Sequence, residues 1–250
     1  MTIVGEQHRT VDPSEIERFA KLAEEWWDPA GKFKPLHRFN PTRLAFIRDR
    51  AAARFGRDTT ASSPFHGLSL VDIGCGGGLV AEPMARLGFA VTGIDAGQAT
   101  IGTAEAHAAQ AGLSIDYRAT TSETLQAEGR RFDVVLALEI VEHVADRAAF
   151  MTTIAGLVAP GGILVVSTIN RTAKAFALAI VGAEYVLGWV PRGTHSWSKF
   201  VRPSELVADL APELEIEELI GTVYQPLTAS WQLAPRDLDV NYMVLASRSA

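Results

Sequence analysis

Residues 71–79 read Val71-Asp72-Ile73-Gly74-Cys75-Gly76-Gly77-Gly78-Leu79, and this stretch decides the fold of the chain. It follows a short apolar run and precedes a segment with helical spacing, so it predicts a strand, a glycine-rich turn and a helix. Glycine allows a sharp turn and lets a ligand approach the backbone closely, because no Cβ intervenes. Asp72 can contact a cationic amino group, and the amides at the helix start can receive a carboxylate. We therefore interpret the turn as part of a nucleotide-binding site.

A second acidic residue supports this interpretation. Asp95 ends the next predicted strand, where it is placed to bind both hydroxyls of a ribose. Taken alone, Asp95 could equally cap the helix that follows. Two alternatives exist for the glycine turn itself. An NAD site expects Gly-x-Gly-x-x-Gly, but Leu79 stands where the third glycine is required, and the simplest alternative is a tight turn that binds nothing.

Short apolar runs alternate with helical segments on both sides of this turn. We predict strands over residues 68–73, 90–94, 115–119, 134–138, 163–168, 214–224 and 242–247, and helices over 80–87, 99–111 and 147–158. Such alternation predicts an α/β fold with a parallel sheet that is covered on both faces. Two further helices, over 14–27 and 41–55, precede a linker rich in Thr, Ser, Gly and Pro. We expect residues 1–56 to form an N-terminal helical cap and residues 57–250 to form the main domain.

Composition limits the functional classes. The chain has 250 residues, of which 48% are hydrophobic, so it can bury a sizeable core. Lys and Arg number 23 against 29 acidic residues, and this net charge of −6 argues against a nucleic-acid-binding face. The single cysteine, Cys75, excludes an intramolecular disulfide. With no secretory signal and no apolar run of roughly 20 residues, we expect a cytoplasmic protein.

Four segments together resemble the successive motifs of class I S-adenosylmethionine-dependent methyltransferases: residues 72–78, Asp95, Phe132-Asp133-Val134-Val135 and Pro160-Gly161-Gly162. The resemblance implies a Rossmann-like fold with a seven-stranded, mostly parallel sheet whose last strand, over 242–247, is antiparallel. It also implies S-adenosyl-L-methionine as the cofactor. The turn and this resemblance together predict the cofactor contacts, which are Asp72, Gly74, Gly76, Asp95, Ser122 and Leu138.

Further segments are similar to one branch of that family, the ubiquinone-biosynthesis O-methyltransferases. They include Trp26-Trp27-Asp28, Asn40-Pro41-Thr42-Arg43-Leu44, Glu139-Ile140-Val141-Glu142-His143-Val144, Pro191-Arg192-Gly193-Thr194-His195 and Asp239-Val240-Asn241-Tyr242-Met243. This resemblance implies two O-methylations, one on 2-polyprenyl-6-hydroxyphenol and a later one on 3-demethylubiquinol. It implies further that Arg43 reaches the cofactor. The linker around Ala61-Ser62-Ser63-Pro64 is longer than expected, but it touches no motif.

The candidate catalytic residues are Glu139, Glu142 and His143, which follow the fourth predicted strand. If this segment is helical, the spacing i, i+3, i+4 places all three side chains on one face. A phenol titrates near pH 10, so methyl transfer needs a base or a cation to stabilise the phenolate. His143 could be the base, oriented by Glu142 or Glu139. Alternatively, the three side chains could bind Mg²⁺, or they could serve packing and capping alone.

A second functional candidate is the apolar segment 173–190, within an insertion over 171–200. Phe176, Leu178, Val181 and Trp189 make it apolar, and Arg171, Lys174 and Arg192 flank it. This pattern suits a helix that lies on anionic lipid at the inner face of the cytoplasmic membrane. Alternatively, the segment could form a lid over the acceptor. Rival functions are methylation of another lipid or quinone acceptor, and a cofactor-binding scaffold in a ubiquinone-biosynthesis complex.

Overall fold

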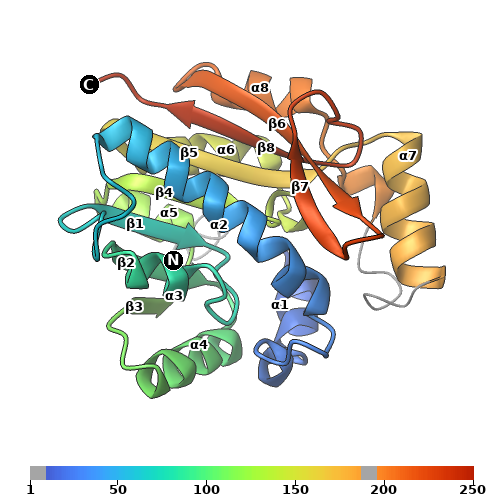
Figure 1. Cartoon of the computed structure of the whole chain (residues 1–250), viewed down its shortest axis with the longest axis horizontal. Helices are drawn as coiled ribbons and strands as arrows, with labels where there is room; N and C mark the ends of the chain where they lie inside the picture. Colours follow the sequence, from blue (N-terminus) through green and yellow to red (C-terminus); the bar gives the residue numbers. More distant parts are fainter. Residues whose placement is uncertain (1–9, 187–195) are drawn as a thin grey trace, which may run out of the picture.

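The first strand, β1 (Ser69–Ile73), lies between β2 (Ala90–Asp95) and β4 (Phe132–Leu138) and is parallel to both. The glycine turn therefore emerges from the middle of the sheet. This arrangement comes from a computed structural model, which describes residues 10–186 and 196–250. Figure 1 shows the sheet running through the molecule, with α2 (Lys34–Phe55) lying across one of its faces.

Five further strands complete the sheet, in the order β3-β2-β1-β4-β5-β8-β6-β7. Their bounds are β3 (Asp116–Ala119), β5 (Val158–Ile169), β6 (Glu215–Gln225), β7 (Ser230–Ala234) and β8 (Asn241–Ser247). The strands β1 to β5 are all parallel to one another, whereas β8 is antiparallel to both β5 and β6. The predicted fold class and the antiparallel last strand are confirmed.

The predicted number of seven strands is wrong by one. The eighth strand is β7, which pairs with β6 as an antiparallel hairpin at the sheet edge. None of its residues is buried, so it leaves no apolar run in the sequence from which a strand could be recognised.

Helices cover both faces of the sheet, and each face has its own core. One core joins α2, α3 (Ala81–Arg86) and α4 (Gln98–Gln110) to the strands through residues such as Phe46, Met84 and Ile101. The other joins α5 (Ser122–Ala127), α6 (Arg147–Gly156) and α8 (Pro203–Leu210) through residues such as Leu125, Met151 and Leu206. The strands between them are buried on both sides, as a parallel sheet requires.

The N-terminal segment is less regular than predicted. The helix α1 (Pro13–Ala20) is capped by Asp12, whose side chain accepts from the Ser14 amide, and only a 3-10 turn, η1 (Ala23–Glu25), continues it. The predicted helix over 14–27 is thus right only in its first half. The second helix, α2, begins before Pro41 and ends at Phe55, and Gly56 caps it with a φ of +61°.

The apolar segment contains α7 (Ala173–Ala175) and a π-helix, η3 (Phe176–Val186), and after it comes the short 3-10 turn η4 (Trp197–Lys199). Within the described ranges, no helix is long and apolar enough to cross a bilayer. The expectations for Trp189, Arg192 and the Pro191-Arg192-Gly193-Thr194-His195 motif lie outside the described residues.

Candidate active site

A cavity of about 1040 Å³ lies at the carboxyl ends of β1, β2 and β4. The sheet forms one wall, through Asp72, Asp95 and Leu138, and the N-terminal segment forms another, through Phe19 and Phe39. The π-helix η3 and the β6–β7 hairpin also contribute to the lining. In an open α/β sheet, ligands bind at this edge of the strands. The cavity is therefore the candidate active site.

Two buried charged groups face this cavity without full hydrogen bonding. Asp72 and Arg43 are each only 3% exposed, and both the Asp72 Oδ2 and the Arg43 Nε lack a hydrogen-bond partner. Arg43 donates to the Asn40 Oδ1 at 2.5 Å, and its guanidinium lies 4.8 Å from the centre of the Phe39 ring. Because unpaired buried charge is costly, this pair indicates a ligand that carries charges of both signs.

Burial shifts the pKa of both groups. Desolvation raises the pKa of Asp72 to about 7, although the nearby Arg43 opposes the shift. Desolvation also lowers the pKa of Arg43, against the attraction of Glu139 and Asp72. A ligand that supplied an ammonium to Asp72 and a carboxylate to Arg43 would restore both charged forms.

Asp95 holds the glycine turn in shape. Its Oδ1 accepts from the Gly97 amide at 2.8 Å, and its Oδ2 accepts from the Gly76 amide at 3.2 Å. Gly74 has a φ of +71° and lines the cavity, and a Cβ there would clash with the Ile140 side chain. Of the predicted cofactor residues, Gly76 alone does not line the cavity: its φ is +54° and the Trp26 ring lies against it. Gly76 acts on the shape of the turn.

The remaining predicted cofactor residues lie in the same cavity. Ser122 begins α5 and is buried, and Leu138 ends β4. Cys75 is buried in the turn, where desolvation raises the pKa of its thiol, as is usual for a cysteine that serves packing.

Two tryptophans attach the N-terminal segment to this turn. The Trp27 Nε1 donates to the Gly77 carbonyl at 2.8 Å, and the Trp27 ring stacks on His107 at 3.5 Å. His107 in turn contacts the buried Glu82 carboxylate at 2.6 Å. Trp26 stacks on Phe33 at 3.8 Å. The N-terminal segment is thus a structural neighbour of the glycine turn.

The segment after β4 does not form the predicted helix. Glu139 has a φ of +53°, and only one 3-10 turn, η2 (Val141–His143), follows it. The two glutamates therefore bond to separate partners on β5: the Ser167 hydroxyl donates to Glu139 at 2.7 Å, and the Thr168 hydroxyl donates to Glu142 at 2.7 Å.

The arrangement does not support the predicted Mg²⁺ site at Glu139, Glu142 and His143. A shared helical face would have brought the three side chains together, but the left-handed residue and the short turn separate them. Across residues 10–186 and 196–250, no group of three His, Cys, Asp or Glu side chains is placed to hold a metal ion.

Glu142 lines the cavity and is buried. Desolvation and the charge of Glu139 raise its pKa to about 7, while His143 and the Thr168 hydroxyl oppose the shift. A carboxyl with such a pKa exchanges its proton close to neutral pH, which is where a proton-transfer group is most effective.

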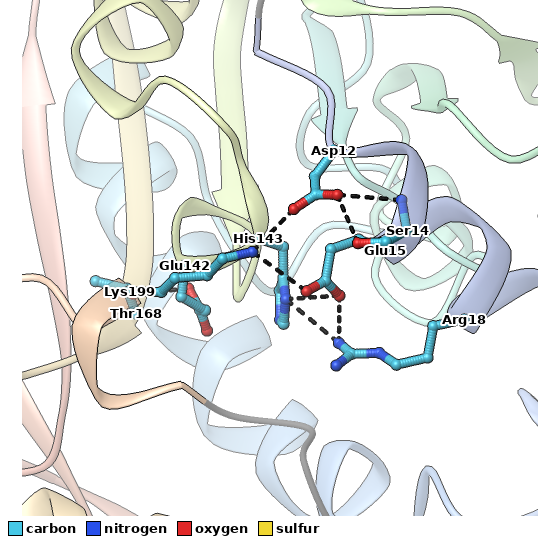
Figure 2. A network of polar contacts seen from close by, with 8 residues as sticks. All are labelled: Asp12, Ser14, Glu15, Arg18, Glu142, His143, Thr168 and Lys199. Carbon is cyan, nitrogen blue, oxygen red and sulfur yellow. Dashed lines mark hydrogen bonds and ion pairs between the residues drawn. The ribbon is translucent and has the colours of Figure 1, made fainter.

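His143 contacts the N-terminal helix, as Figure 2 shows. Its Nδ1 lies 3.3 Å from the Glu15 Oε2, and the Arg18 Nη2 lies 2.5 Å from the same oxygen. Lys199 reaches the Glu15 Oε1 at 3.4 Å and the Asp12 Oδ2 at 3.0 Å. The Phe19 ring meets the imidazole edge-on at 5.4 Å.

Sequence reasoning missed Glu15. It assigned Glu142 or Glu139 as the partner that orients His143, because those residues are adjacent in the chain. The structure instead brings α1, η2 and η4 together at the imidazole. The only trace in the sequence is the polar side of α1, where Asp12, Glu15 and Arg18 are spaced three residues apart.

Comparison with known proteins agrees with this architecture. Residues 36–211 match the family model described as a methyltransferase domain. Magnesium protoporphyrin IX methyltransferase from Synechocystis PCC 6803, solved with bound SAH, superposes with a TM-score of 0.62 at 18% identity, covering 95% of each chain. A methyltransferase from Clostridium acetobutylicum gives 0.61 at 12% identity, covering 94% of this chain and 99% of that one. These two likenesses establish the fold.

Sequence relatives are much closer. The ubiquinone biosynthesis O-methyltransferase of Parvibaculum lavamentivorans is 57% identical over 96% of this chain and 95% of its own length. The protein of the same name from Brucella anthropi is 59% identical over 96% of this chain and 97% of its own. The chain belongs to the ubiquinone biosynthesis O-methyltransferase family.

Proposed function

We propose that this chain is an S-adenosyl-L-methionine-dependent O-methyltransferase of ubiquinone biosynthesis, which methylates 2-polyprenyl-6-hydroxyphenol and 3-demethylubiquinol. The observation that carries the proposal is one cavity lined by two chemically different groups of residues. Asp72 and Arg43, an unsatisfied pair of opposite charges, form the cofactor group, and Glu142 and His143 form the acceptor group. The names of the close relatives supply the pathway.

The charged pair matches the zwitterionic part of the cofactor. Arg43 binds the carboxylate and Asp72 binds the ammonium, since each has a buried polar atom without a partner. Asp95 takes the ribose hydroxyls, and Ser122 and Leu138 border the adenine. Gly74 keeps the turn open to the ligand, and Gly76 contributes to the shape of the turn.

We assign proton removal from the acceptor hydroxyl to the acceptor group. When bound, S-adenosyl-L-methionine supplies an electrophilic methyl group. A phenol is mostly protonated at neutral pH, so His143 accepts its proton as the oxygen attacks. Glu142 stabilises the imidazolium that results, because its carboxyl lies buried beside His143.

A turnover assay on the full chain tests the proposal. Purified protein, methyl donor and a soluble catechol analogue are expected to give the methyl ether, with and without a chelator. Absence of heat with S-adenosyl-L-methionine or S-adenosylhomocysteine in calorimetry contradicts the cofactor assignment. Donor binding without product supports the scaffold alternative. Loss of turnover in chelator returns the metal mechanism to consideration.

We propose also that the protein contacts the inner face of the cytoplasmic membrane through an apolar patch, defined as Phe176, Leu178, Val181 and Trp197. Their exposed fractions are 43%, 54%, 43% and 37%, and Phe176 meets Trp197 edge-on at 5.7 Å. Leu178 also lines the cavity, so a polyprenyl tail that left the cavity here would meet this patch. An exposed apolar surface beside a lipid-binding cavity suits partial insertion among lipids.

We expect the attraction between this segment and anionic lipid to be weaker than the sequence indicates. Arg171 donates to the Glu205 carboxylate at 2.6 Å, and Lys174 contacts Asp237 at 3.0 Å and Asp239 at 3.2 Å. Both cations therefore already have acidic partners. We expect apolar insertion to dominate binding to the membrane.

Vesicle flotation tests the membrane contact. Phe176→Ser with Leu178→Ser should reduce the bound fraction about tenfold on neutral and anionic vesicles alike, since apolar burial is lost. Leu227→Ser is the matched control, because Leu227 is exposed on the β6–β7 connection, outside the patch. Equal flotation of the double variant and the unmodified chain would refute the proposal.

A further inference from the structure

Three aromatic side chains from distant parts of the chain meet on one side of the cavity. Phe39 comes from α2, Tyr224 from β6 and Trp231 from β7, and all three line the cavity. The ring centres of Phe39 and Trp231 lie 4.5 Å apart, and those of Tyr224 and Trp231 lie 5.6 Å apart. We call these three residues the aromatic wall. The proposed proton transfer uses none of them.

The aromatic wall is held in place by both the hairpin and α2. Tyr224 and Trp231 are a cross-strand pair of the β6–β7 hairpin, and the Thr42 hydroxyl on α2 donates to the Trp231 carbonyl at 2.8 Å. Figure 1 shows this hairpin beside the first turns of α2. Phe39 is buried, whereas Tyr224 and Trp231 are half-buried. A preformed and partly open surface of this kind can cover an apolar ligand at little cost in ordering.

Phe39 connects the aromatic wall to the cofactor group. The Arg43 guanidinium, which we propose binds the cofactor carboxylate, lies 4.8 Å from the centre of the Phe39 ring. The wall therefore begins one side chain away from the cofactor group. The cavity volume of about 1040 Å³ is at the upper end of the range for small-molecule sites, about 300–1,000 Å³, so the cavity has room for more than a cofactor and one ring.

The position of the wall in the sheet decides which part of a ligand it can contact. Asp95 and Ser122, proposed for the ribose and the adenine, follow β2 and β3 on one side of the sheet, whereas β6 and β7 form the other side. The candidate base follows β4, and β6 lies three strands further on, roughly 14 Å at the usual strand spacing. Because the methylated hydroxyl must lie at the base, only a long substituent of the acceptor ring can reach the wall.

We infer that the aromatic wall is the subsite for the first isoprene units of the acceptor's polyprenyl tail. The inference rests on the proposed function, which supplies the acceptor ring and its tail. Isoprene units are apolar, so contact with the three aromatic rings removes apolar surface from water on both sides. Leu178 and Ala179 of η3 line the same cavity, so a longer tail that stays in the cavity can also reach the apolar patch.

Acceptors that differ only in the tail test the subsite. Catechol, 3-(3-methylbut-2-enyl)catechol and 3-geranylcatechol form a series with a tail that grows by one isoprene unit at each step. For the unmodified chain, the first unit should lower KM about tenfold or more, because its apolar surface becomes buried. Trp231→Ala should lose most of this gain, while KM and kcat for catechol itself and the affinity for S-adenosylhomocysteine stay unchanged. An equally large gain in Trp231→Ala would overturn the inference.

Leu233→Ala is the matched control for loss of an apolar side chain. Leu233 is exposed on the same strand and is not among the residues that line the cavity, so this variant should keep the full gain. Trp231→Phe keeps an aromatic face and should retain part of the gain. It takes the place of Trp231→Ala if complete loss of the ring unfolds the hairpin, and a full gain in Trp231→Phe and in a folded Tyr224→Ser would count against the subsite.

Photo-crosslinking locates the tail without any substitution. A catechol that carries a diazirine on its first isoprene unit is irradiated in the complex of the full chain with S-adenosylhomocysteine, and the labelled residues are identified by mass spectrometry. Label on α2 near Phe39 or on the β6–β7 hairpin supports the subsite. Label confined to α1 or η3 places the tail elsewhere and contradicts the inference.

The proposed function and the subsite fail in different ways. A chain that methylates none of the catechols refutes the proposed function, and this inference with it. A chain that methylates all three with the same KM refutes only the role of the aromatic wall.

Discussion

The cofactor group and the acceptor group of the cavity are built in different ways. The cofactor group comes mainly from consecutive strand ends and the turn between them, with Asp72, Gly74 and Asp95 close together in the sequence. The acceptor group lies where α1, η2 and η4 meet, and these elements lie far apart in the sequence. The first group follows from local backbone rules, whereas the second depends on how the helices dock. Substitutions of His143 and Asp72 test whether the two groups are functionally separate, and substitutions of Gly76 and Glu142 test how each is held in the fold.

The largest effect is expected for His143→Ala. Removal of the base should lower turnover about 10²- to 10⁴-fold, since general-base catalysis contributes this much. Affinity for S-adenosylhomocysteine should stay unchanged in calorimetry, because Asp72 and Arg43 are untouched. His66→Ala, an exposed site before β1, is the control. A parallel loss of cofactor affinity would mean that the cofactor group and the acceptor group are coupled.

Gly76→Ala probes the junction between the N-terminal segment and the glycine turn. Alanine must adopt a φ of +54° and its Cβ must displace the Trp26 ring. We expect a loss of about 2–4 kcal/mol in the free energy of unfolding, measured by denaturant titration. Gly102→Ala in α4 is the matched control, since open space surrounds that position, and it should be neutral or slightly stabilising. Equal stability of the two variants would show that Trp26 does not restrain the turn.

Asp72→Asn should weaken cofactor binding more than turnover, which is the reverse of the result expected for His143→Ala. Loss of one charged hydrogen bond to the ligand should weaken S-adenosylhomocysteine binding about 10- to 100-fold. Turnover at saturating donor should change far less. Asp116→Asn, at the exposed start of β3, controls for the loss of one charge. If kcat at saturation fell as much as affinity, the assignment of Asp72 to ground-state cofactor binding would be wrong.

Glu142→Gln tests stability and not turnover, and its expected effect has a defined sign. The folded-state pKa is raised from 4.5 to about 7, so between these values the folded protein binds more protons than the unfolded chain. The stability of the unmodified protein should therefore fall as pH rises through this window. Relative to Glu142→Gln, it should lose about 3 kcal/mol in the free energy of unfolding between pH 4.5 and 8. A constant difference across this range would show that the pKa of Glu142 is not raised in the folded protein.

Particular residues show how much of this could be predicted from the sequence. The glycine turn, Asp95 and the alternating apolar runs specify the central strands, because each signal is local. The edge strand β7 was missed since its side chains are not buried, and α1 was predicted too long. The positive φ of Glu139 broke the helix assumed for Glu142 and His143. The contact of Glu15 with His143 could not be predicted, because only the docking of α1 brings Glu15 to the imidazole.

The position of β8 has a consequence for how the protein forms during synthesis. This strand follows β6 and β7 in the sequence, yet it lies inside the sheet between β5 and β6, which share no direct pairing. On the ribosome, the β6–β7 hairpin can therefore join the nascent sheet only after residues 241–247 leave the exit tunnel. Until then the edge of β5 stays unpaired, and an unpaired edge strand can pair with other chains.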